Sequence, residues 1–265
     1  MKKRGIYVVM AFLVFSLQIF ALDFIESEKV EKIFKRYKEN GTFVLYNPQN
    51  NEFIGYNRKR AEERFYPAST FKIYNSLIGL HTGVVKDVDE VFYKYNGEKV
   101  FLKSWARDSN LRYAMKVSQL PVYELLAKKV GMEKMQKEIE RLNFGNKDIG
   151  KNLEEFWVKG PLKVSAIEQC ELLAKLAKSE LPYSKVIQKQ VQDITILESS
   201  ENLVFHGKTG WSGSRSVEPV GWFVGWIEKN GEIYSFAINL EMKDRKNLYK
   251  REEIAKESLK ALGIL

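Results

Sequence analysis

Cysteine and histidine are scarce in this chain of 265 residues, which has Cys170 as its one cysteine and only two histidines, His81 and His206. A lone cysteine excludes an intrachain disulfide, and one cysteine with two histidines cannot supply the four ligands of a Cys/His zinc site. The carboxylates show no EF-hand spacing. We therefore expect no bound metal.

Long hydrophobic runs are also scarce, and the one present is residues 6–22. Basic residues at 2–4 precede it, and the small Ala21 stands near its end, before an acidic stretch. This order of basic, apolar and small residues is typical of a secretory signal peptide, so we expect residues 1–21 to be removed and the protein to be periplasmic or secreted. The alternative is an uncleaved anchor, because the run is close to the shortest that spans a bilayer. Only then would the protein be membrane-bound.

Charge of one sign is not concentrated anywhere, although the 43 basic and 34 acidic residues leave a formal charge of +9. The lysines are scattered among Glu and Asp, whereas a nucleic-acid site normally needs a basic patch or a recognisable module. The hydrophobic share of 45% and the charged share of 29% are those of an ordinary globular protein. We expect no nucleic-acid partner and see no sign of an obligate protein partner.

Strand patterns lie near both ends of the chain, and helical patterns lie between them. Runs rich in β-branched and aromatic residues predict strands at 42–46, 52–56, 203–206, 220–228 and 232–241. Apolar residues spaced by three and four predict helices at 27–38, 70–81, 122–142, 165–179 and 252–262.

This order predicts a mixed α/β fold, in which the two ends of the chain build one antiparallel sheet flanked by terminal helices. An all-helical lobe is then inserted between them. No Pro/Gly/Ser-rich linker separates the parts, so residues 22–265 are expected to form a single domain. Its sheet lobe would comprise about 22–62 and 199–265, and its helical lobe about 63–198. A cleft between the lobes is the default place for a site.

Ser69 and Lys72 stand at the predicted start of a helix, where a spacing of three puts both side chains on one face. A serine hydroxyl becomes a good nucleophile when a base takes its proton, and a lysine amine can do so if apolar burial lowers its pKa. The backbone N–H of Ser69 at the helix start could stabilise an oxyanion. In a lysine-rich chain the alternative is an ordinary solvated helix face.

Two further segments carry groups that could join such a site. Ser118 could relay a proton to a leaving group, or it could simply cap a helix. Lys208, Thr209 and Gly210 follow an apolar strand, where a cation and a hydroxyl could bind a substrate carboxylate and the glycine would let the substrate lie close to the backbone.

Two other readings of these residues are weaker. Lys208-Thr209 could end a phosphate-binding loop, but that motif needs a glycine at position 202 and a helix after Thr209, and the chain has Asn202 and a poor helix start. A Ser-His-Asp triad with His81 or His206 is open on spacing, but no serine lies in a Gly-x-Ser-x-Gly turn.

Taken together and in order, these motifs resemble the penicillin-recognising serine enzymes, and within them the class D, or oxacillinase-type, β-lactamases. The resemblance covers nearly the whole chain after the signal segment. It is carried by Ser69-x-x-Lys72, Ser118-x-Leu120, Phe144-Gly145-Asn146, Phe156-Trp157, Lys208-Thr209-Gly210 and Gly221-Trp222.

The resemblance implies a β-lactamase-like fold and the hydrolysis of β-lactams, which are cyclic amides, through an acyl-enzyme on Ser69. It implies that CO2 carboxylates Lys72, that the product is the general base for acylation and deacylation, and that no other cofactor is needed. Burial among Phe71, Leu120 and Trp157 would keep the amine neutral, as carboxylation requires.

The resemblance also implies roles for the other site residues. Trp157 would donate a hydrogen bond to the carboxylated lysine, and Ser118 would pass a proton to the lactam nitrogen. The oxyanion hole would consist of the N–H groups of Ser69 and Trp211. Substrate would be bound by Leu120, Lys208, Thr209, Gly210 and Arg251.

Three departures from the family pattern qualify these roles. Leu120 and Phe144 stand where many members have Val and Tyr, and Phe144 lacks the hydroxyl of that Tyr. The arginine that binds the substrate carboxylate is the least secure assignment, because Lys250 and Arg245 are close to Arg251.

The alternative function is a β-lactam sensor, which is acylated by its substrate but does not turn over. Such receptors carry several membrane spans, whereas this chain has one short apolar run. The sequence does not indicate which β-lactams are preferred.

Overall fold

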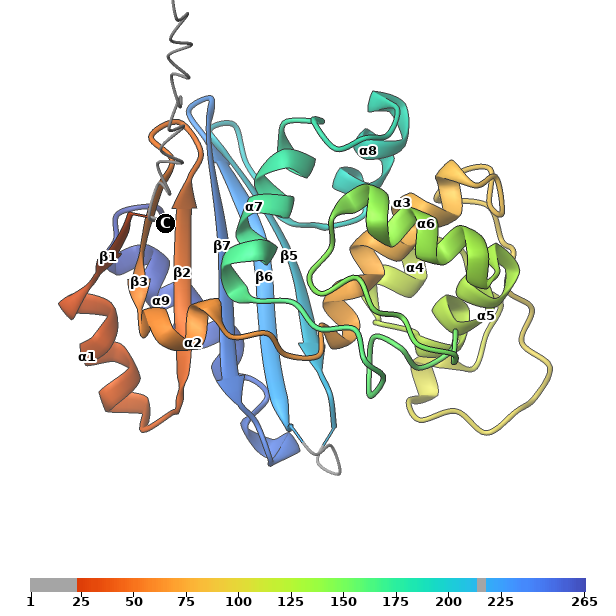
Figure 1. Ribbon diagram of the computed structural model, residues 1–265, viewed down its shortest axis with the longest axis horizontal. Helices are drawn as coiled ribbons and strands as arrows, with labels where there is room; N and C mark the ends of the chain where they lie inside the picture. The colour runs from red at the N-terminus through yellow and green to blue at the C-terminus, as the bar shows by residue number, and fades with distance from the viewer. Residues whose placement is uncertain (1–22, 214–217) are drawn as a thin grey trace, which may run out of the picture.

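The computed structural model describes residues 23–213 and 218–265, which form a sheet with helices on both faces and a group of helices at one end (Figure 1). The sheet has seven strands in the order β1-β3-β2-β7-β6-β5-β4. Their bounds are β1 Phe24–Glu26, β2 Gly41–Asn47, β3 Glu52–Tyr56, β4 Ile196–Ser199, β5 Leu203–Trp211, β6 Val220–Lys229 and β7 Glu232–Glu241. The predicted mixed α/β class is confirmed, and the two ends of the chain meet where β2 pairs with β7.

Every strand pairing is antiparallel except that of β1 with β3, in which Phe24 lies opposite Phe53. Parallel neighbours need a long crossover, and here α1 (Glu28–Tyr37) followed by β2 supplies it. A three-residue strand with an uneven burial pattern leaves little periodic signal, and for that reason the sequence analysis did not find β1.

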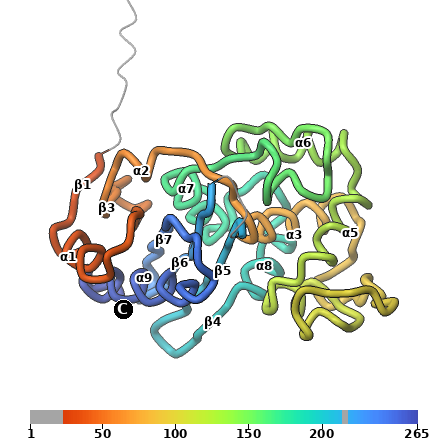
Figure 2. The backbone as a smooth tube through the Cα atoms, turned by 90° about the horizontal axis from the view of Figure 1, so that it is seen from below, coloured from red at the N-terminus to blue at the C-terminus, as the bar shows by residue number. Residues whose placement is uncertain are grey.

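The terminal helices cover one face of the sheet, as predicted. Helix α9 (Lys250–Ala261) packs beside α1 (Figure 2). The Tyr37 hydroxyl of α1 donates to Glu257 of α9 over 2.7 Å. Both helices place their apolar sides on a core formed with the strands, to which α1 contributes Val30 and α9 contributes Ile254.

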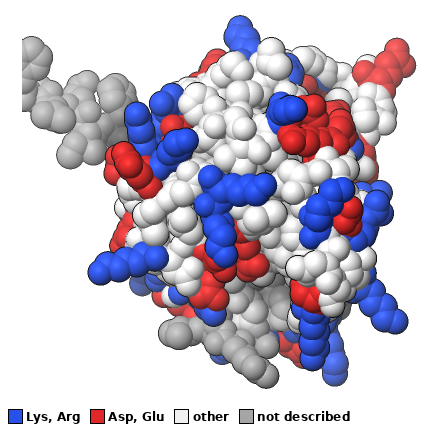
Figure 3. All heavy atoms as spheres, turned by 90° about the vertical axis from the view of Figure 1, so that its right-hand side faces the viewer, with Lys and Arg blue, Asp and Glu red and all other residues white. Residues whose placement is uncertain are grey.

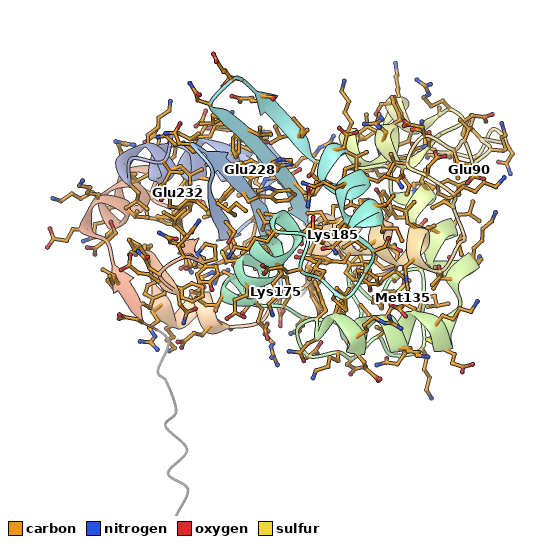
Figure 4. All side chains as sticks on the ribbon, turned by 90° about the horizontal axis from the view of Figure 1, so that it is seen from above. Glu90, Met135, Lys175, Lys185, Glu228 and Glu232 are labelled. Carbon is orange, nitrogen blue, oxygen red and sulfur yellow. The ribbon has the colours of Figure 1, made fainter. Side chains whose placement is uncertain are left out.

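Helix α7 (Ala166–Ala177) covers the opposite face and contacts β2, β6 and β7. The Ser235 hydroxyl of β7 donates to the Cys170 carbonyl over 2.7 Å. In Figure 4 this helix, marked by Lys175, lies between the strands and the helix marked by Met135. The sequence analysis assigned it to the helical lobe. Because α7 is buried on almost every side, its pattern shows no single face that would identify its neighbours.

The remaining helices form the part of the molecule at the right of Figure 1. They are α3 Lys72–His81, α4 Leu111–Lys116, α5 Leu120–Val130, α6 Met132–Leu142 and α8 Lys185–Asp193, with short α2 (Arg58–Glu62) beside the sheet. Short 3-10 helices cover Ala68–Phe71, Lys103–Trp105 and Arg245–Asn247. The predicted single helix over 122–142 is wrong: Gly131, with φ +82°, separates α5 from α6. Only glycine adopts that conformation without strain.

Within 23–213 and 218–265, no helix is long and apolar enough to cross a membrane. The predicted signal peptide, residues 1–21, lies outside the described residues.

Candidate active site

The side chains of Ser69 and Lys72 meet at the junction of a 3-10 turn with α3. Residues Ala68–Phe71 form the turn, and α3 continues from Lys72 without a break. Ala68 has φ +50°, an unusual value for a residue with a side chain, and its N–H donates to the Trp157 carbonyl over 2.8 Å. This tight turn leaves Lys72 Nζ 2.8 Å from Ser69 Oγ, so the predicted pair is within hydrogen-bonding distance.

Lys72 lies in an aromatic environment and is 1% exposed. The Tyr123 ring centroid is 5.4 Å from Nζ, and the ring of Phe71, the preceding residue, stacks with that of Trp157 at 5.8 Å. Burial lowers the pKa of Lys72 to about 7, and the Glu124 carboxylate opposes this shift. A large fraction of Lys72 is therefore neutral near pH 7.

The indole of Trp157 is fully buried, and its Nε1–H has no hydrogen-bond partner in the described parts of the chain. Buried N–H groups in native proteins nearly always find an acceptor, because an unpaired one costs about 1–3 kcal/mol. An acceptor bound beside Lys72 would remove this cost.

Ser118 and Lys208 form a second pair, which joins the helices to the sheet. Ser118 lies between α4 and α5 with φ +53°, and its hydroxyl accepts from Lys208 Nζ over 3.0 Å. Lys208 also donates to the Thr209 carbonyl over 2.8 Å. Burial lowers the pKa of Lys208 well below its usual value, and the neighbouring Lys72 and Arg251 charges lower it further.

Arg251 reaches the same strand from the first turn of α9. Its Nη1 donates to the Gly210 carbonyl and its Nε to the Leu248 carbonyl, each over 2.7 Å. Burial lowers the pKa of Arg251 to about 10, so it remains a cation at neutral pH. The neighbouring Lys250 instead pairs with Glu39 at 2.5 Å.

Gly210 brings β5 close to the nucleophile turn. A Cβ atom at this position would lie 3.1 Å from the Pro67 carbonyl oxygen and 3.1 Å from Thr70 Cγ2. A larger residue would push the strand away from Ser69, so the glycine keeps the two walls of the site together.

A cavity of about 470 Å³ opens beside Ser69 and brings most of the predicted residues together. Its lining comprises Ser69, Phe101, Leu102, Trp105, Ser118, Leu120, Val158, Thr209, Gly210, Trp211, Arg245, Leu248 and Arg251. The cavity is largely apolar, with hydroxyls and guanidinium groups at a few positions. Lys72, Lys208 and Trp157 lie behind this surface, because each is at most 5% exposed.

Sequence reasoning missed several of these lining residues, notably Phe101, Val158 and Leu248. Phe101 is 65% exposed in a polar stretch. Three large apolar residues between charged neighbours, Phe101, Leu102 and Trp105, were the signal that could have drawn attention to this loop.

The Phe144-Gly145-Asn146 motif lies outside the cavity. Phe144 packs edge-on against Phe71 at 5.4 Å, and the Asn146 amide donates to the Pro161 carbonyl over 2.8 Å. The motif therefore supports the segment that carries Trp157, and the missing hydroxyl at Phe144 removes nothing from the cavity lining.

The histidine and phosphate-loop alternatives do not fit this geometry. His206 stacks on Trp226 at 4.0 Å and bonds to Thr195, and His81 stands beside Glu138. Neither histidine lines the cavity. The residues around Thr209 continue β5 where a phosphate loop would begin a helix.

Two other kinds of site, a charged surface patch and a metal site, were sought among the described residues. On the helical face Lys and Arg stand beside Asp and Glu without a broad area of one sign (Figure 3). Across 23–213 and 218–265, no group of three His, Cys, Asp or Glu side chains could hold a metal ion.

Comparison with known proteins agrees with this geometry. Residues 41–260 match the penicillin binding protein transpeptidase domain. Fold and family match together define a penicillin-recognising protein, in which Ser69 stands at the start of a helix beside Lys72.

Individual relatives show which group of penicillin-recognising proteins the chain belongs to. β-Lactamase OXA-48 of Klebsiella pneumoniae is 40% identical over 233 residues, covering 88% of this chain and 87% of its own. β-Lactamase OXA-5 of Pseudomonas aeruginosa is 38% identical over 236 residues, covering 88% of each chain. The crystal structure of FUS-1 (OXA-85), a class D β-lactamase from Fusobacterium nucleatum subsp. polymorphum, superposes with a TM-score of 0.88 at 55% identity, covering 91% of this chain and 99% of that one. The chain belongs to the class D β-lactamases, so the family prediction is confirmed.

Proposed function

We propose that this protein hydrolyses β-lactams through a Ser69 acyl-enzyme and so confers β-lactam resistance. The observation that carries the mechanism is the buried Lys72 amine, 2.8 Å from Ser69 Oγ. The unpartnered Trp157 indole belongs to the residue whose carbonyl accepts from Ala68, next to Ser69. Ser69 attacks the lactam carbonyl and gives its proton to the side chain at position 72. The N–H groups of Ser69, in the first turn of a helix, and of Trp211, at the end of β5, bind the oxyanion.

Lys72 is also the residue that CO2 would modify. Only the neutral amine adds CO2, and the adduct loses a proton to become a carbamate; a pKa of about 7 makes that neutral form abundant. The modified side chain would supply an oxygen base and an acceptor for the Trp157 Nε1–H. The residues present therefore fit this group, and no other cofactor is part of the proposal.

The other end of the cavity would bind the substrate. Thr209 and Arg251 hold the carboxylate of the β-lactam, and its approach raises the pKa of Lys208 again. Ser118 accepts a hydrogen bond from Lys208, and it passes a proton to the lactam nitrogen when the ring opens. Leu120 and Gly210 shape the walls on either side.

The same proposal includes export. Residues 1–21 would act as a cleaved signal peptide, which places the enzyme in the periplasm or outside the cell, where β-lactams reach it first. The proposed partners are small β-lactam molecules, with no nucleic acid or obligate protein partner, and the membrane is involved only if the segment stays uncleaved.

Turnover of a chromogenic cephalosporin tests the proposal. We expect many turnovers per molecule, and we expect Ser69→Ala to abolish them, while Ser200→Ala, at an exposed serine in the β4–β5 connection, leaves the rate unchanged. One equivalent of product followed by no further hydrolysis would identify a β-lactam sensor instead.

A further inference from the structure

An aromatic ring and a guanidinium group meet at the mouth of the cavity, at a place to which the proposed mechanism assigns no role. Arg245 Cζ lies 4.9 Å from the centroid of the Phe101 ring. Both residues line the cavity that contains Ser69. Phe101 is nevertheless 65% exposed, and its ring centroid is 6.0 Å from that of Trp105.

The two side chains come from opposite walls. Phe101 belongs to the loop before the 3-10 turn Lys103–Trp105, on the helical side. Arg245 begins the 3-10 turn between β7 and α9, on the sheet side. Their contact therefore spans the opening above the apolar floor of the cavity.

Arg245 is available for this contact because, among residues 23–213 and 218–265, its guanidinium makes no salt bridge and no side-chain hydrogen bond. Within these residues its partner is the Phe101 ring. Asp244 caps the turn by accepting from the Lys246 N–H over 2.9 Å, which fixes the backbone from which Arg245 extends. A planar guanidinium stacks on aromatic faces and keeps its charge in water.

We propose that Phe101 and Arg245 form a clasp that binds the acylamino side chain of the β-lactam and favours substrates whose side chain carries an aromatic ring. This inference rests on the proposed hydrolysis at Ser69. The carboxylate is held at the other end, by Thr209 and Arg251, so the clasp is a separate contact with a part of the substrate that does not react.

An aromatic side chain suits the clasp better than an aliphatic one. A ring that enters beside Phe101 meets the aromatic edge of Trp105 and the flat cation of Arg245, both of which attract aromatic faces or edges. Leu120, Val158 and Leu248 supply apolar surface below. Contacts with a distant part of the substrate, made equally in ground and transition state, lower KM and leave kcat unchanged.

Comparing KM for two substrates distinguishes the effect of this contact from that of the rest of the site. Oxacillin has an aryl acylamino side chain, and 6-aminopenicillanic acid has the same bicyclic core without one. We expect Phe101→Ala to raise KM for oxacillin about tenfold, and Arg245→Ala to raise it about three- to fivefold. For 6-aminopenicillanic acid KM should stay within about twofold, and kcat should do so for both compounds.

Matched variants test the stacking itself. Lys246→Ala removes a neighbouring exposed charge from the same turn and should change neither KM, whereas Phe101→Tyr keeps the ring and should restore oxacillin binding. Equal effects of Arg245→Ala and Lys246→Ala would mean that only net charge matters and would overturn the clasp. So would a Phe101→Ala enzyme that changes KM for both substrates by the same factor.

Binding measured without chemistry keeps this inference distinct from the proposed function. In a Ser69→Ala background, tryptophan fluorescence gives Kd for each compound. A Phe101→Ala change that weakens oxacillin alone supports the clasp even if the wild-type protein fails to turn over. If the ratio of the two Kd values does not change, the clasp is wrong even if hydrolysis is efficient.

Discussion

The site holds two buried lysines that differ in what surrounds them. Lys72 is buried with the Tyr123 ring 5.4 Å from its Nζ, and it donates a hydrogen bond to Ser69 Oγ. Lys208 lies on β5 between a hydroxyl and a carbonyl that both accept its hydrogen bonds. Both pKa values are lowered mainly by burial, yet of the two it is Lys72 that lies within hydrogen-bonding distance of Ser69 Oγ.

The comparison shows that burial alone does not make a lysine side chain a general base. At Lys72 the polar partner is the Ser69 hydroxyl, which the proposed mechanism makes the nucleophile. At Lys208 the partners are the Ser118 hydroxyl and the Thr209 carbonyl, which both accept and suit an ammonium group. The proposed function therefore assigns Lys72 to the reaction and Lys208 to the substrate.

Replacing each lysine by methionine is the most direct way to break the comparison. Lys72→Met keeps a chain of similar length without the amine, and we expect kcat to fall by about 10²- to 10⁴-fold because general base catalysis is lost. Added bicarbonate should not restore it. Lys208→Met should lose about tenfold and still respond to bicarbonate under CO2-depleted conditions, as measured by steady-state hydrolysis. Similar losses and similar bicarbonate responses in both variants would remove the distinction.

Trp157→Phe tests what the indole N–H of Trp157 contributes. The ring is retained but the N–H is lost, so the modified Lys72 loses a hydrogen bond to a charged group, worth about 1.5–3 kcal/mol. We expect activity at low bicarbonate to fall about 10- to 100-fold and to recover in part as bicarbonate is raised. Trp226→Phe, another buried indole far from the cavity, should show no bicarbonate effect. A bicarbonate response equal to that of the wild type in Trp157→Phe would contradict the role given to its N–H.

The lysines also show how far the sequence alone could lead. Ser69 and Lys72 are three residues apart at a predicted helix start, so a local spacing placed them together. The apolar pattern predicted a strand only at 203–206, whereas β5 extends through Lys208 to Trp211. Strand β1 was harder, because a length of three residues leaves no periodic signal. Helix α7 was predicted, but burial on almost every side hides which elements it packs against.

Contacts between distant loops were beyond sequence reasoning. Arg251, Lys250 and Arg245 are all basic and close in sequence, so the sequence does not distinguish their roles. The docking of α9 turns Arg251 toward Gly210 and Lys250 toward Glu39. The pairing of Arg245 with Phe101 depends on two loops that are 144 positions apart and on no motif.

Arg251→Gln tests the substrate end of the comparison. Gln can still donate a hydrogen bond but carries no charge, so we expect KM for a penicillin to rise about three- to tenfold, with kcat less affected. Lys250→Gln, at the neighbouring position paired with Glu39, should leave KM unchanged. If Lys250→Gln had the larger effect, the carboxylate would be bound by a different cation.

The smallest effect concerns Glu124, the carboxylate that opposes the lowered pKa of Lys72. A negative charge favours the protonated amine, so its removal in Glu124→Gln lowers the pKa of Lys72 further. Activity that needs the neutral amine is lost as pH falls through the pKa of about 7, and the midpoint of this acid limb should therefore move to lower pH, by about 0.5. The pH dependence of kcat/KM at fixed bicarbonate measures the shift.

Lys128→Gln removes an exposed cation beside Glu124 and should leave the midpoint nearly unchanged, since exposed charges are screened by solvent. A shift to higher pH in Glu124→Gln would mean that the limb belongs to a group other than Lys72.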